Sequence, residues 1–105
     1  MLTVPPEEAA ARIRAGAPVV DVRAPAQYAR AALPGSTNLP FAAVAAGAIP
    51  AGAGADTELY VVCEVGSFSE LAAAHLRAAG LAGARSVRGG LAALPPLLGD
   101  QSDGR

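Results

Sequence analysis

The sequence contains one cysteine, Cys63, and its position suits covalent chemistry. It ends the segment 58–63, which is apolar after Glu58 and predicts a strand, and a helix-forming segment begins at about Ser69. A short loop between a strand and a helix N-terminus can turn several backbone N–H groups toward one point, and the helix dipole adds partial positive charge. Both effects favour a thiolate. We therefore interpret Cys63 as a candidate nucleophile whose anion is held by the backbone N–H groups of Glu64, Val65, Gly66, Ser67, Phe68 and Ser69.

Other interpretations of this loop remain open. Cys63 could be only a small buried apolar residue, as free cysteines often are, although its place between strand and helix favours reactivity. Ser67 and Ser69 offer hydroxyl groups to a bound anion, and Ser69 is equally suited to cap the helix. Phe68 either forms one wall of a pocket or closes the pocket as an apolar plug.

Further polar side chains are candidates for the same site. Asp21 and Arg23 lie near the carboxyl end of the expected strand 19–22. They either line the edge of the pocket or form a structural ion pair, and we favour the ion pair. His75 falls about one and a half turns into the expected helix, and this spacing argues against hydrogen-bond contact with Cys63 as a general base. With one cysteine and one histidine in the chain, we expect no metal and no cofactor.

The elements that must position these residues alternate along the chain. Strands are expected at 3–4, 19–22, 37–39, 58–63 and 84–87, and helices at about 5–14, 25–30, 41–46, 69–80 and 91–94, the last ended by Pro95 and Pro96. This order predicts a single α/β domain with a mostly parallel sheet of about five strands and helices on both faces. In such sheets the chemistry lies outside the carboxyl ends of the strands. We expect the domain to span residues 1–98 and residues 99–105 to form a flexible tail.

Composition excludes several classes of function. The 105 residues carry a net charge of −1, all eight basic residues are arginine, and only 4% of the chain is aromatic. The near-neutral charge provides no basic surface for binding nucleic acid, and so few aromatic residues provide no set of rings on which bases could stack. The absence of lysine excludes a Schiff base and a Walker-type phosphate loop. No apolar stretch is long enough to cross a bilayer and no signal peptide is visible, so we expect no membrane partner and a cytoplasmic location.

Four landmarks in the right order resemble the rhodanese-like, or sulfurtransferase, domain family. The first is the strand ending in Asp-x-Arg, the second is a Tyr followed by a Pro-Gly turn, the third is a Cys-x-x-Gly-x-x-Ser loop, and the fourth is a Gly-Gly pair before the last helix. They lie at residues 19–23, 27–40, 60–69 and 87–91. The resemblance covers nearly the whole chain. It implies a rhodanese-like domain in which the Cys63 thiolate accepts a sulfur atom from a small donor.

The chain departs from the family at positions that bear on function. Family loops often carry Arg directly after the Cys and again five residues after it, where this chain has Glu64 and Phe68. Gln27 replaces an acid, and Ala32 replaces a His. Without the loop cations we expect poor use of thiosulfate, because charge-assisted hydrogen bonds would hold that dianion. The phosphatases of this fold have a longer loop with an Arg where Ser69 stands, so phosphoryl chemistry is disfavoured.

Two functional hypotheses follow. The first is a sulfurtransferase that carries sulfane sulfur as a persulfide on Cys63 and passes it to cyanide, a small thiol or a protein thiol. The second is a non-catalytic rhodanese-like module that binds a partner or senses oxidation at Cys63. The absent loop arginines favour the second hypothesis, whereas Cys63, Gly66 and Ser69 favour the first. On balance we favour the enzyme.

Overall fold

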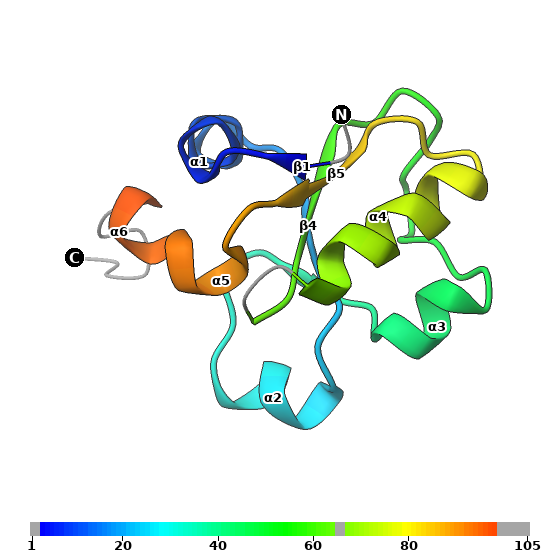
Figure 1. Ribbon diagram of the computed structural model, residues 1–105, viewed down its shortest axis with the longest axis horizontal. Coiled ribbons are helices and arrows are strands. Elements are labelled where there is room, and N and C mark those ends of the chain that lie inside the picture. Colours follow the sequence, from blue (N-terminus) through cyan, green and yellow to red (C-terminus); the bar gives the residue numbers. More distant parts are fainter. Residues whose placement is uncertain (1–2, 65–66, 99–105) are drawn as a thin grey trace.

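The computed structural model describes residues 3–64 and 67–98 and shows five strands alternating with helices (Figure 1). The strands are β1 (Thr3–Val4), β2 (Val19–Asp21), β3 (Thr37–Asn38), β4 (Leu59–Val62) and β5 (Ala84–Val87). The helices are α1 (Pro6–Arg14), α2 (Pro25–Arg30), α3 (Phe41–Ala45), α4 (Ser67–Ala78), α5 (Gly90–Ala93) and α6 (Pro95–Leu98).

All five strands pair in parallel, in the order β1-β5-β4-β2-β3. The central strand β4 is bounded by β2, with Asp21 opposite Val62, and by β5, with Leu59 opposite Ala84. Every residue of β4 is buried, as expected for a parallel strand covered on both faces. The predicted α/β class and the five-stranded parallel sheet are confirmed.

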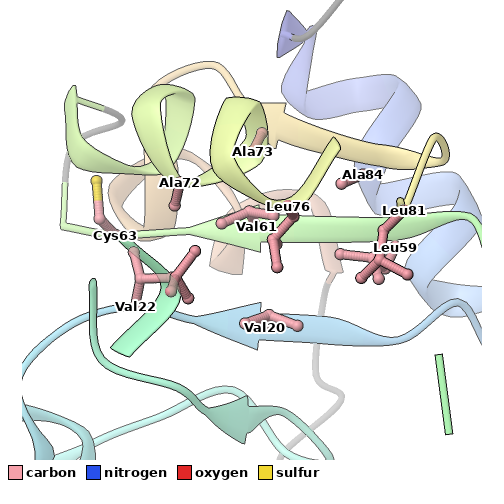
Figure 2. Packing of buried hydrophobic residues seen from close by; sticks show 11 residues of the cluster. Val20, Val22, Leu59, Val61, Cys63, Ala72, Ala73, Leu76, Leu81 and Ala84 are labelled. Carbon is pink, nitrogen blue, oxygen red and sulfur yellow. The ribbon is translucent and has the colours of Figure 1, made fainter. Parts of the chain in front are cut away.

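Helices cover both faces of the sheet and form two apolar cores. On one face, α3 and α4 pack against Val20, Val61 and neighbouring residues (Figure 2). On the other face, α1, α5 and α6 pack around Val19, Tyr60 and Val62. Successive strand residues therefore alternate between the two cores, as the pleat of a strand requires. Helix α2 has no buried residue and lies in Figure 1 below the sheet, on the side where β2 ends.

The sequence placed most elements correctly, but one helix start was wrong and one short helix was missed. Helix α4 begins at Ser67 rather than at Ser69, so the connection after Cys63 is shorter than predicted. The helix expected at 91–94 does end before Pro95, since α5 stops at Ala93 with Leu94 as its C-cap residue, but it is not the last one, because Pro95 and Pro96 start α6. Proline is tolerated in the first turn of a helix because its missing N–H group has no partner there in any case. The expected tail at 99–105 lies outside the described residues.

Candidate active site

Cys63 is the first residue after β4, at the carboxyl edge of the sheet. Its side chain is 4% exposed and belongs to the core beneath α4. Figure 2 shows Cys63 at one end of this core, beyond Val22 and Ala72. Because β2 and β4 are parallel neighbours, the residues that follow β2 lie beside the residues that follow β4.

Two backbone hydrogen bonds fix the chain around the cysteine. The Leu91 amide donates to the Cys63 carbonyl oxygen at 2.9 Å, and the Ala92 amide donates to the Glu64 carbonyl oxygen at 3.2 Å. Both donors lie in α5, which follows β5. The carbonyl groups at the cysteine are therefore bound from one side by α5, while α4 begins four residues further along the chain. Val65 and Gly66, which the sequence assigned to the anion cradle, lie outside the described residues.

A cavity of about 450 Å³ opens beside Cys63. Three segments that are distant in sequence form its walls. They are residues 22–25 with Gln27 after β2, residues 40–42 after β3, and Cys63, Glu64 and Phe68 around the start of α4. The cavity thus lies at the carboxyl edge of the parallel sheet, where ligand sites of such sheets occur.

Phe68 forms part of the cavity wall, and its side chain remains 57% exposed. Its ring lies 5.4 Å from that of Phe41, centroid to centroid, at an interplanar angle of 54°. His75 also packs against Phe41 in an edge-to-face arrangement, with the ring centroids 6.0 Å apart. The open cavity favours the interpretation of Phe68 as a wall rather than a plug. His75 is exposed and does not line the cavity.

Asp21 and Arg23 form an ion pair next to the cavity. Asp21 is fully buried, and both its oxygens accept hydrogen bonds from Arg23 Nε at 3.1 Å, while Nη2 donates to Oδ2 at 2.9 Å. The hydrogen bond to Asp21 raises the pKa of Arg23 above its ordinary value, and burial opposes this only in part. Arg23 also lines the cavity, whereas Asp21 does not. The pair is therefore structural, and Arg23 additionally forms part of the pocket edge.

Glu64 places a negative charge at the mouth of the cavity. Its side chain is 66% exposed, and one oxygen lies 3.6 Å from Arg23 Nη1. Arg23 Nη2 also donates to the Ala31 carbonyl oxygen at 2.6 Å. Arg23 thus has two carboxylates and a carbonyl group as partners, which reduces the positive charge that it presents to an anion in the cavity.

Ser69 has a structural contact that the sequence did not predict. It is the third residue of α4 rather than its cap, and it is fully buried. Its Oγ lies 2.8 Å from Ser86 Oγ on β5, a hydrogen bond that connects helix and sheet. Neither of the roles expected for Ser69 therefore describes this contact. Ser67 is the first residue of α4 and is exposed.

The sequence missed several cavity residues, among them Pro40, Phe41 and Gln27. The available signal was the parallel strand order. In such a sheet the segments that follow neighbouring strands lie together, so the segment after β3 should have been assigned to the site.

In the part of the chain that the structure describes, no three His, Cys, Asp or Glu side chains are grouped so that they could hold a metal ion. The same part contains no helix of the length and apolar character that a bilayer span requires.

Comparison with protein families identifies a relationship over most of the chain. The model of the rhodanese-like domain family matches residues 5–94. A thiosulfate sulfurtransferase, GlpE, of Pseudomonas fluorescens is 40% identical over 87 residues, which cover 83% of this chain and 78% of that protein. GlpE of a second strain of this species is 38% identical over the same length.

Solved structures agree with this result. A rhodanese homolog from Thermus thermophilus is 38% identical, with a TM-score of 0.66 over 88% of this chain and 99% of its own. A human single-domain sulfurtransferase has a TM-score of 0.78 over 89% of this chain and 94% of its own. At 24% identity, the human protein supports the fold alone. Together the comparisons support activity of the rhodanese type.

Proposed function

Because the chain belongs to the rhodanese-like domain family, we propose that it is a sulfurtransferase that carries sulfane sulfur as a persulfide on Cys63. The observation that carries the proposal is the position of Cys63. The cysteine lies at the carboxyl end of the central strand, ahead of a helix N-terminus and at the wall of a cavity of about 450 Å³. Because Cys63 lines this cavity, we propose that the donor approaches its sulfur from there.

The proposed reaction has two steps. The Cys63 thiolate attacks the outer sulfur of the donor, the donor's sulfur–sulfur bond breaks, and the leaving group departs with the electron pair of that bond. An acceptor thiolate or cyanide then attacks the outer sulfur of the persulfide and regenerates the Cys63 thiolate. We propose that the backbone N–H groups of residues 64–69 stabilise the anion in both states, as helix N-termini do for other anions. A reducing compartment such as the cytoplasm suits this chemistry, because Cys63 must remain a thiol between turnovers.

One observation favours a second candidate, a non-catalytic binding or redox-sensing module. Glu64 and Phe68 occupy the positions at which family loops often have arginine, and Glu64 faces Arg23. An acid at this position repels anionic donors. The two candidates differ in whether a sulfur atom is transferred to Cys63 and removed again.

Mass spectrometry of the intact protein distinguishes them. After incubation with thiosulfate or an organic persulfide donor, the protein should gain the mass of one sulfur atom, and cyanide or dithiothreitol should remove it. The Cys63→Ser variant should show no adduct, because serine is nearly isosteric but cannot form a persulfide. An adduct on this variant, or none on the wild type with any donor, would contradict the sulfurtransferase.

A further inference from the structure

The cavity beside Cys63 is lined mainly by apolar side chains. Of the eleven described lining residues, Val22, Ala24, Pro25, Pro40, Phe41, Ala42 and Phe68 are apolar. The remaining ones are Cys63 itself, Arg23, Gln27 and Glu64. A volume of about 450 Å³ is larger than an inorganic sulfur anion requires and lies in the range of sites for small organic ligands.

The charges at this cavity do not suit a dianion. Arg23 is the one basic side chain among the described lining residues, and it binds the buried carboxylate of Asp21 through two nitrogens. Its remaining nitrogen faces Glu64 at 3.6 Å. The basic group is therefore neutralised by Asp21, and Glu64 adds a negative charge that opposes a second negative charge on the donor.

The aromatic pair supplies an apolar surface next to the sulfur. Phe41 begins α3 and Phe68 lies in the first turn of α4, and their rings are 5.4 Å apart. Phe68 is 57% exposed although it is a large apolar side chain. A ligand with an apolar body would remove part of this ring from water, which is favourable in proportion to the area covered.

From these observations we infer that Phe41 and Phe68 form a subsite for the organic group of a singly charged sulfane-sulfur donor, and that Phe68 determines the preference for a donor with a large apolar group over one with a small group. The inference rests on the proposed function and adds the class of donor. A thiosulfonate anion belongs to this class. The Cys63 thiolate attacks its terminal sulfur, the bond between the two sulfur atoms breaks, and a sulfinate leaves with the electron pair. One thiolate and one thiosulfonate thus give one persulfide anion and one sulfinate, with no oxidant or proton required.

Two donors of equal charge isolate the contribution of the apolar group. Benzenethiosulfonate and methanethiosulfonate share the reacting atoms and differ in the group that would contact Phe68. The second-order rate constant for sulfur transfer to Cys63 is measured with each donor. The ratio of these two constants is then divided by the ratio of the rate constants of the same two donors with a small free thiol, which gives the corrected ratio. We expect the corrected ratio to favour the benzene compound by about tenfold in the wild type, or about 1.4 kcal/mol.

The Phe68→Ala variant should lower this corrected ratio to within about threefold of unity, a loss consistent with the value of a covered aromatic ring. Leu71→Ala is the matched control. Leu71 lies on the same helix and is similarly exposed, at 55%, but it does not line the cavity. The ratio of the Leu71→Ala variant should equal that of the wild type.

The outcomes separate this inference from the proposed function. Sulfur transfer to Cys63 from both donors without a corrected preference for the benzene compound would overturn the apolar subsite and leave the sulfurtransferase in place. A preference that is equally strong in Phe68→Ala would overturn the assignment to Phe68. Absence of transfer from every donor would overturn the proposed function itself, and the inference with it.

Discussion

Arg23 Nη2 and Asp21 Oδ2 lie 2.9 Å apart at the carboxyl edge of the sheet, where Asp21 is fully buried. The Arg23 backbone amide donates to Asp21 Oδ1 at 2.9 Å, and Nε contacts both oxygens. The pair shapes one wall of the cavity that Cys63 faces, because Arg23 lines that cavity. It also explains why a basic residue so near the cysteine adds little positive charge to the cavity.

Removal of Arg23 should destabilise the fold. In the Arg23→Gln variant the buried Asp21 carboxylate loses its countercharge, and the free energy of unfolding should fall by about 3–5 kcal/mol. Urea denaturation measures this value. Arg30→Gln, an exposed substitution on α2, should change it by less than about 0.5 kcal/mol. If Arg23→Gln has an effect no larger than Arg30→Gln, the pair does not stabilise the fold. Asp21→Asn in the Arg23→Gln background should restore part of the loss.

Restored loop cations should improve the use of thiosulfate. The double variant Glu64→Arg, Phe68→Arg places two guanidinium groups at the cavity, and each charged hydrogen bond to the dianion should raise the second-order rate constant by about tenfold to a hundredfold. Sulfite release from thiosulfate measures the rate. The variant Glu64→Gln, Phe68→Gln removes the acid and the ring without adding cations. It therefore shows how much of the gain comes from loss of the repulsion between Glu64 and thiosulfate rather than from attraction by the new arginines. A double arginine variant no faster than the glutamine control would show that these cations do not limit the reaction.

Tyr60 should make stability depend on alkaline pH. Burial raises its pKa to about 12, and a hydrogen bond from its hydroxyl group to Glu58 acts in the same direction. The ordinary pKa of a tyrosine hydroxyl group is 10.0, so the unfolded chain releases this proton first as the pH rises. The contribution of the Tyr60 hydroxyl group to the free energy of unfolding is therefore fully present below about pH 10 and is lost between about pH 10 and 12.

The Tyr60→Phe variant provides the comparison for this effect. The difference in free energy of unfolding between wild type and variant should be constant below about pH 10. Above this pH the wild type should lose stability relative to the variant. Subtraction of the two phenolate absorbance titrations should give a midpoint near 12 for Tyr60. A midpoint near 10 would contradict the buried, hydrogen-bonded hydroxyl group.

Gly83 should not tolerate a side chain. A Cβ atom at this position would overlap the carbonyl group of Thr57 and lie 3.2 Å from Glu58 Cα, because the two backbones pass closely before β4 and β5 begin. Gly83→Ala should therefore lower the free energy of unfolding by about 1–3 kcal/mol. At Gly54 the nearest atom is Thr57 Oγ1 at 4.0 Å, and Gly54→Ala serves as the control. Equal thermal midpoints for the two variants would contradict the close approach.

The sequence alone determined the order of elements and the place of Cys63. Buried strands such as Leu59–Val62 consist of apolar, largely β-branched residues, and proline and glycine mark most boundaries, so local preference and tertiary structure agree. The alternation of strands and helices then implies parallel pairing, because right-handed crossovers return each strand to the same direction. Cys63 had to lie at the carboxyl edge of that sheet, and the structure places it there.

Which side chains meet at this edge depends on how the helices pack on the sheet. Phe41 and Phe68 belong to different helices, and their contact depends on how α3 and α4 pack against one face of the sheet. Likewise, Ser69 looked like a helix cap because serine suits that position, yet α4 extends past it and buries its hydroxyl group against Ser86. Such contacts depend on the distances between packed elements. Each partner's own segment is compatible both with the contact and with its absence. Local sequence preference therefore does not predict the contact.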